Sequence, residues 1–169
     1  SARVWFLDGE QLIAGPGAVG RGPELYASNP GAIPLAGSHP YARAVRERGG
    51  RAIDDWIEFT RYVFQRGEQS TLFPEGKAYT LEESEQLATA FGTRSAMAAP
   101  LGRLNPLGAI SVSRVDVRPF GAGELTTLEA FAAQAVVAIE TARAQQQLVE
   151  RNDALAKGLD RETATADIL

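Results

Sequence analysis

Few residues of this sequence carry side chains suited to acid–base or nucleophilic chemistry. His39 is the only histidine, so a metal site built from several histidines is excluded. A Ser/His/Asp triad of His39 with Asp54 or Asp55 is conceivable, but no nucleophile-elbow pattern accompanies it, and His39 lies at an expected helix start. Asp54 and Asp55 are adjacent, and neighbouring strand residues point to opposite faces, so they cannot form a catalytic pair. The alternative is a histidine in a first turn and aspartates that cap or support a loop.

The segment GPGAVG places Gly15, Gly17 and Gly20 in the G-x-G-x-x-G spacing of dinucleotide-binding loops. That motif works because its glycines open a helix whose N-terminal amides hold a pyrophosphate. Here no helical periodicity follows before residue 38, and Pro16 has no amide hydrogen to offer. We therefore interpret the segment as a flexible lid or loop.

Other residues are suited to binding a ligand. An aromatic stretch after residue 55 fits neither the helical nor the strand period, and it either lines an apolar pocket or forms the core of an irregular loop. It contains Trp56, Tyr62, Phe64, Phe73 and Tyr79. Ser95 and Met97 share one face of an expected strand, as do Ser111 and Ser113 of the next, but the sequence leaves open which face is inside. The candidate ligand-binding residues are Trp56, Tyr62, Phe64, Ser95, Met97 and Ser111.

Composition narrows the classes of function. The sequence has no cysteine, which excludes disulfides, thiolate catalysis, cysteine-ligated zinc and thioether attachment of a chromophore. The net charge is −4 and the pI about 5.1, which argues against nucleic acid and anionic membranes as partners. No apolar run approaches the roughly 18 residues of a membrane span, and the first residues do not resemble a signal peptide. We expect a soluble, cytoplasmic domain.

The elements that position these residues can be predicted from turn and cap signals. Residues 2–14 predict two antiparallel strands joined at Asp8-Gly9, followed by an irregular connection over 15–37. Ser38 is expected to cap a short helix with Pro40 in its first turn and Gly49 just past its end. The segment RAID predicts a brief strand.

The second half of the chain continues this mixed pattern. Thr80 and Glu83 form a capping box for a helix that ends at Gly92. The segments SAMAAPLG and LGAISVSRV predict two strands whose turn contains Asn105-Pro106. The order of elements predicts an α+β domain with a mainly antiparallel sheet.

A helical pattern then runs from about residue 122 to the last residue, which corresponds to a helix near 70 Å long. Its first half has one apolar stripe, formed by Leu128, Ala132, Ala135, Ile139 and Ala142, that we expect to close the domain core. The second half repeats the four-and-three spacing at Leu148, Asn152, Leu155, Leu159, Glu162, Ala166 and Leu169. This second stripe restarts six residues after Ala142, so the buried face has rotated.

A helix that changes its buried face has changed its partner, and two such helices side by side form a parallel coiled coil. Asn152 would then occupy an a position and fix a two-stranded register. We expect a homodimer through Leu148, Asn152, Leu155 and Leu159. The alternative is a solvated or frayed C-terminal tail.

The stretch from Ser95 to Arg143 resembles the C-terminal half of a GAF domain. Its matching features are Pro100-Leu101 at a strand end, Leu107-Gly108-Ala109-Ile110 in the next strand, a Pro-Phe turn, and Ala133-Gln134-Ala135 in the following helix. The segment IPLAGSHPYARAVRERGGRAIDDW is also similar to the middle of that family. The resemblance implies an antiparallel sheet of about six strands, helices on both faces, and a long C-terminal signalling helix.

The resemblance also implies a function. Residues 1–145 would form a sensory domain with a small-molecule pocket, and residues 146–169 a coiled-coil linker to a covalently linked output module, a bacterial histidine kinase or nucleotide cyclase. We expect a non-enzymatic module without metal or bound cofactor, whose ligand is an unidentified small molecule. The alternatives are a ligand-free dimerisation module with a vestigial pocket and a small-molecule enzyme on the same scaffold.

Overall fold

A computed structural model describes residues 1–18, 32–68, 80–90 and 92–166. The candidate pocket residues Phe73 and Tyr79, and the third glycine of the GPGAVG segment, lie outside this part of the chain. The chain divides into two compact units, Ser1–Ala133 and Gln134–Leu169, and each is described by itself.

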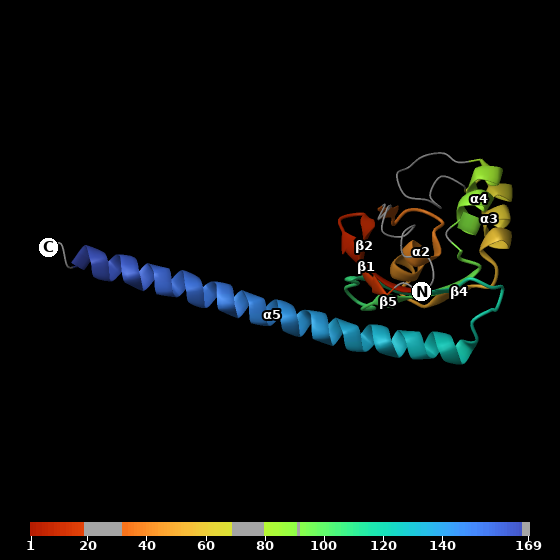
Figure 1. Ribbon diagram of the computed structural model, residues 1–169. Helices are drawn as coiled ribbons and strands as arrows, with labels where there is room; N and C mark the ends of the chain where they lie inside the picture. Colours follow the sequence, from red (N-terminus) through yellow and green to blue (C-terminus); the bar gives the residue numbers. More distant parts are fainter. Residues whose placement is uncertain (19–31, 69–79, 91, 167–169) are drawn as a thin grey trace. The chain divides into compact units, whose positions relative to one another are not determined.

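The first unit is built on a six-stranded sheet, and every strand pair in it is antiparallel (Figure 1). The strand order is β3-β2-β1-β6-β5-β4. The strands are β1 (Ala2–Asp8), β2 (Gln11–Ala18), β3 (Ile33–Pro34), β4 (Arg51–Ile53), β5 (Ser95–Leu101) and β6 (Gly108–Arg114). The predicted α+β fold with about six antiparallel strands is confirmed.

Glycines shape the β1–β2 hairpin. Gly9 takes a φ of +56° in the two-residue turn, as the primed hairpin turns require. The expectation of a loop from residue 15 is wrong, because β2 continues to Ala18 and includes Gly15 and Gly17. The Phe6 ring explains Gly15, since a Cβ there would come within 2.5 Å of Phe6 Cε2. A side chain at residue 15 would therefore require the Phe6 ring to move.

Four helices accompany the sheet in the described residues: α2 (Pro40–Arg46), α3 (Trp56–Gln65), α4 (Leu81–Ala90) and α5 (Ala122–Ala166). The predicted capping box of α4 is confirmed, because Thr80 N donates to Glu83 Oε2 and Glu83 N to Thr80 Oγ1. The predicted cap of α2 is wrong. His39 holds that position, and its Nδ1 accepts a hydrogen bond from Tyr41 N.

The sheet has two covered faces, which we call inner and outer. The register places Trp5, Leu12, Ala98, Ala109 and Ser111 on the inner face, where a core cluster includes residues of α2. Met97, Ala99 and Leu101 alternate onto the outer face. All seven residues of β5 are buried, which is typical of a strand covered on both sides. Figure 1 shows α2 on one side of the sheet and the first turns of α5 on the other.

The second unit, Gln134–Leu169, contains the remainder of α5. Among the described residues of this unit the helix has no second element to pack against, and the apolar side chains Val137, Leu148, Val149 and Leu155 are exposed. The side chain of Leu159 lies outside the described part. The predicted division of function at residue 145 stays a prediction.

Candidate functional site

The floor of the candidate site is the inner face of the sheet at β1 and β6. Trp5 and Ser111 lie there side by side, and both are buried. Trp5 Nε1 donates a hydrogen bond to Ser111 Oγ at 2.9 Å. The Ser111 hydroxyl in turn donates to the backbone carbonyl of Arg3 at 3.4 Å. The indole, which needs a partner for its N–H when buried, is thus fixed in orientation by the serine.

Aromatic rings from α2 and α3 cover this floor. The Tyr41 ring lies 5.5 Å from that of Trp5, and His39 packs edge-on against Tyr41 at 4.6 Å between centroids. Trp56, at the first turn of α3, is 5.5 Å from His39, and Phe59 continues the chain of rings at 6.0 Å from Trp56. One of these contacts is edge-to-face and the others are tilted, and none is the face-to-face sandwich that aromatic pairs disfavour. The rings therefore join the starts of α2 and α3 to the sheet.

His39 is structural in this setting. It is buried, and burial lowers its pKa to about 3, so the ring is neutral near pH 7. Because Nδ1 accepts the hydrogen bond from Tyr41 N, the ring proton lies on Nε2. Asp55 caps α3 and pairs with Arg94 at 2.8 Å, and the bond from Arg94 holds the pKa of Asp55 below its usual value. The described contacts thus engage Asp55 with Arg94 and do not assemble a triad around His39.

A small cavity lies over the inner face of the sheet at β1 and β6. A cavity of about 40 Å³ lies among Arg3, Trp5, Tyr41, Ser111 and Ser113. One water occupies about 30 Å³ in the liquid, so this space suits a water or the tip of a ligand. Its border combines hydroxyl groups with aromatic surface, which is the usual composition of a small-molecule site. Among the described residues, no group of three or more His, Cys, Asp or Glu side chains could hold a metal ion.

Of the six predicted ligand-binding residues, the structure places two on the inner side of the sheet, and of these two Ser111 borders the cavity. Trp56 and Ser111 both belong to the inner side of the sheet, Trp56 through the core cluster and Ser111 at the cavity. Ser111 pairs with Ala98 of β5, so these two side chains lie on the same face of the sheet. Side chains alternate along a strand, so Ser95 and Met97 lie on the opposite face. Their role in binding stays a prediction that the geometry does not favour.

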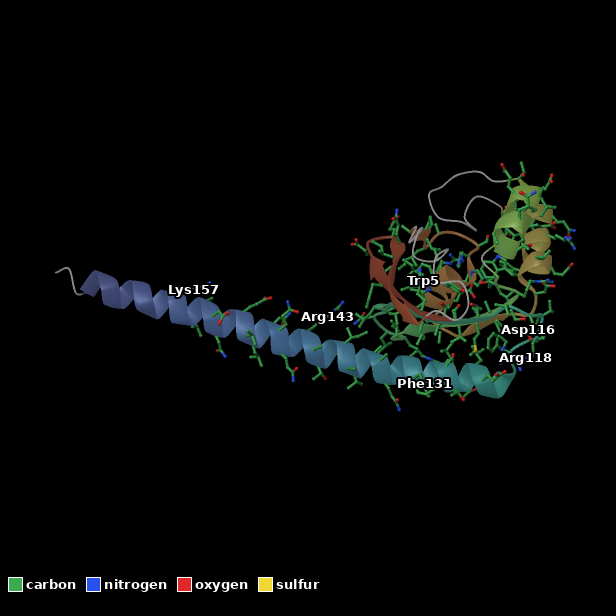
Figure 2. All side chains as sticks on the ribbon, viewed as in Figure 1. Trp5, Asp116, Arg118, Phe131, Arg143 and Lys157 are labelled. Carbon is green, nitrogen blue, oxygen red and sulfur yellow. The ribbon has the colours of Figure 1, made fainter. Side chains whose placement is uncertain are left out.

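Ser95 is engaged with backbone groups. Its hydroxyl donates to the Asp54 carbonyl at 2.6 Å and accepts a hydrogen bond from Arg118 N at 2.9 Å. It thereby joins β5 to the start of α3 and to the connection between β6 and α5, in which Asp116 and Arg118 lie close together (Figure 2).

Tyr62 and Phe64 lie on α3 away from the cavity. Tyr62 is 51% exposed. Together with Arg43 it separates two surface grooves of about 450 and 430 Å³. Phe64 is half-buried. These two positions therefore do not share a site with Ser111 in the described residues.

Sequence reasoning missed Trp5, Tyr41 and Arg3 as site residues. The sequence did contain a signal for Arg3 and Trp5, because they are two residues apart on β1 and their side chains therefore lie on the same face of the strand. No comparable signal existed for Tyr41. Its place at the site depends on how α2 packs on the sheet, which is a tertiary relationship.

Comparisons with known proteins agree with this architecture. The family model described as GAF domain matches residues 14–139. No curated relative matches the chain in sequence. Among solved structures, the second GAF domain of DevS from Mycobacterium smegmatis is similar with a TM-score of 0.56, at 22% identity, over 87% of this chain and 84% of that one.

Two further solved structures have a similar fold. The GAF domain of a two-component sensor histidine kinase from Bacillus halodurans has a TM-score of 0.58 at 16% identity, covering 86% of this chain and 84% of that one. A type II free methionine-R-sulfoxide reductase from Thermoplasma acidophilum has a TM-score of 0.50 at 14% identity, covering 80% and 74%. At these identities the likeness shows the fold.

The last of these comparisons corrects an expectation. We expected a chain of this kind to be non-enzymatic, and that inference from the family is wrong, because solved structures with the same fold include a sulfoxide reductase, which is an enzyme. Signalling modules and an enzyme therefore share this architecture.

Proposed function

This chain belongs to the GAF domain family, and from that premise we propose that it is a small-molecule sensor that signals through α5 to a covalently linked output module. The output would be a histidine kinase or a nucleotide cyclase. GAF domains of sensor kinases are signalling modules, and one such domain is similar in fold to this chain. The observation that carries the proposal is the cavity among Trp5, Tyr41 and Ser111, where hydroxyl and aromatic groups meet on the inner face.

The size of the cavity decides how a ligand would enter. Ligand sites typically measure about 300 to 1,000 Å³, several times the 40 Å³ present here. A ligand larger than a few atoms must therefore displace a ring. Tyr41 is the movable one, because it belongs to a short helix, whereas Trp5 is held by its strand and by Ser111. Binding would then push α2 away from the sheet.

Ligand binding could produce a signal if two chains pair through α5 and the pair has two states. In the second unit, Leu148, Asn152 and Leu155 follow four-and-three spacing, and both leucines are exposed. A lone helix cannot remove these side chains from water, whereas a two-stranded coiled coil would. This supports a homodimer through α5. A ligand with about 1 to 3 kcal/mol of differential affinity for two states of the pair is enough to signal.

The same helix bears on the cellular location. By length and composition the segment Ala122–Leu155 could cross a membrane, although such a test is weak support for a span. Its first turns contain Leu128 and Ala132, which are buried within the first unit, and Glu129, which hydrogen-bonds to Gly50. We propose that α5 is a signalling helix in water and that the module is cytoplasmic, with neither nucleic acid nor membrane as partner.

Two measurements test the proposal. Native mass spectrometry of freshly purified protein should show a retained small molecule, and S111A should lower its occupancy. Light scattering should give a dimer, which L148K/L155K should convert to monomer while Q146K/A154K, with equal added charge outside the seam, stays dimeric. A dimer without any ligand would favour the ligand-free dimerisation module, and a monomeric wild type would reject the coiled coil.

A further inference from the structure

The turn between α2 and β4 contacts the first turns of α5, where the Gly50 amide meets the Glu129 carboxylate. Gly50 N donates a hydrogen bond to Glu129 Oε1 at 2.8 Å, across 79 residues of sequence. The other carboxylate oxygen, Oε2, lies 3.1 Å from the Arg103 guanidinium in the β5–β6 turn. The Glu129 side chain is 28% exposed, whereas that of Arg103 is 66% exposed, so the bond to the Gly50 amide is the better shielded from water.

We propose that Gly50 and Glu129 form a latch that couples the position of α2 to the first turns of α5. The idea rests on the proposed function in one respect, namely that Tyr41 on α2 borders the cavity. In the closed state the carboxylate binds the amide of the α2–β4 turn. In the open state the turn moves away, and the Glu129 carboxylate loses the Gly50 amide but retains its ion pair with Arg103.

Gly50 lies close against two side chains of α5. A Cβ at this residue would lie 2.9 Å from Glu129 Oε1 and 2.9 Å from Leu125 Cδ1. The φ of Gly50 is not positive, so its lack of a side chain is explained by this close approach. At the neighbouring Gly49 a Cβ would meet nothing nearer than 3.9 Å. Close approach is therefore a property of Gly50 and not of the whole turn.

Several hydrogen bonds connect the end of α2 to the turn and to the start of β4. Glu47, which caps the C-terminal end of α2, accepts a hydrogen bond from Arg43 Nε at 2.8 Å and another from Arg51 Nε at 2.9 Å at the start of β4. Arg51 also donates to the Gly50 carbonyl at 3.0 Å. Because these bonds clamp the residues on both sides of Gly50, a shift of α2 moves the Gly50 amide with it.

Hydrogen exchange of the full, unliganded chain tests the latch, with Gly50→Ala as a wedge and Gly49→Ala as the matched control. We expect G50A to speed exchange roughly tenfold both in 40–48 and in 122–133, the change that loss of one charge-assisted hydrogen bond would produce. G49A should leave both segments unchanged. Peptides of β5 and β6 report whether the fold is intact.

Variants of the carboxylate provide a second, independent arm. Glu129→Ala should speed exchange in the same two segments, whereas Glu129→Gln, which keeps an acceptor for Gly50, should preserve most of the protection of α2. Glu124→Ala removes a glutamate of α5 that bonds to Gly121 and Arg114, so it should loosen the start of α5 without affecting α2.

The latch is rejected if G50A and E129A change exchange only at residues 49–51, or if G49A acts like G50A. Should G50A fail to fold, the E129A arm decides alone. No ligand enters this experiment, so a failure to retain a ligand in mass spectrometry would reject the sensor and leave the latch standing. If a ligand is retained but G50A and E129A do not change exchange in both segments, the latch is rejected and the sensor proposal stands.

Discussion

Gly108 and Trp5 approach each other so closely across the β1–β6 pair that no side chain fits between them. A Cβ at residue 108 would lie 1.8 Å from the Trp5 carbonyl oxygen, and the φ of Gly108 is +150°. We predict that Gly108→Ala lowers the free energy of unfolding by more than about 3 kcal/mol, because the clash is with backbone and β1 must move. Urea denaturation followed by circular dichroism measures this.

Gly123 supplies the control for that substitution. It lies in the first turn of α5, and a Cβ there would meet nothing within 4 Å. Gly123→Ala should therefore stabilise the protein by up to about 1 kcal/mol, the helix preference for alanine over glycine. Equal destabilisation by both variants would show that the β1–β6 contact is not the cause.

The pair of serines on β6 allows a test of the site floor. Ser111→Ala leaves the buried indole N–H of Trp5 without its acceptor, which should cost about 1 to 3 kcal/mol of stability. Ser113 lies two residues on, and its hydroxyl pairs with that of Ser1 at an exposed position, so Ser113→Ala should change stability by less than about 0.5 kcal/mol. Tryptophan fluorescence during denaturation reports both. A W5F background should abolish the difference between the two serine variants.

Local signals in the sequence predicted much of the fold. The capping box at Thr80, the Gly9 turn and the segment that becomes β5 each depend on residues close in sequence, and each formed as expected. The helix α3 was missed. Its buried positions are Trp56, Thr60 and Val63, a helical spacing, but Thr60 counts as polar, and its hydroxyl is satisfied by the Trp56 carbonyl at 2.8 Å.

The site was harder to predict than the fold, and the reason lies in β5. When both faces of a strand are buried, the hydrophobic pattern no longer marks an inside. Ser95 and Ser111 were therefore equivalent candidates in the sequence. Only the packing of α2 on one face and of the first turns of α5 on the other separates them, and these are contacts between residues far apart in the chain.

The buried histidine should give the protein a distinct pH dependence. The pKa of His39 is about 3 in the folded protein because of burial, against an ordinary value of 6.5. Between these values the unfolded state binds more protons, so the free energy of unfolding should fall by about 1 kcal/mol from pH 6.5 to 5.5 and by nearly 1.4 kcal/mol over the next unit. Denaturation at pH 6.5, 5.5 and 4.5 measures the slope.

Two considerations isolate the histidine in that experiment. Glu47, whose pKa hydrogen bonds from Arg43 and Arg51 lower to about 2, contributes stability that is lost progressively as the pH falls from about 5.5 toward 2. His39→Asn keeps an acceptor for Tyr41 N and cannot titrate. The variant should be less stable at every pH because ring contacts are lost, but its slope between pH 6.5 and 5.5, where the carboxylates stay ionised in both states, should vanish. A variant slope equal to that of the wild type would assign the effect to other groups.

Ser95 and Ser84 offer a test of whether a buried serine serves the fold or a ligand. Both are fully buried. The Ser95 hydroxyl bonds to Asp54 and Arg118, whereas the Ser84 hydroxyl has no partner among the described residues. Ser95→Ala should therefore lower the free energy of unfolding by about 2 to 3 kcal/mol, and Ser84→Ala should be neutral or stabilising. Thermal and urea denaturation of the two variants measure the difference.

The two possible roles of Ser95 predict opposite patterns. A structural serine, when replaced, weakens the connection that leads into α5, so hydrogen exchange at residues 115–121 should rise while occupancy of a retained small molecule stays the same. A ligand-binding serine would reduce occupancy and leave that exchange unchanged. The geometry favours the first pattern, because the hydroxyl donates its one hydrogen to Asp54 and accepts from Arg118, which leaves no hydrogen to donate to a ligand. Lost occupancy with unchanged stability would return Ser95 to the site and place the ligand on the outer face of the sheet.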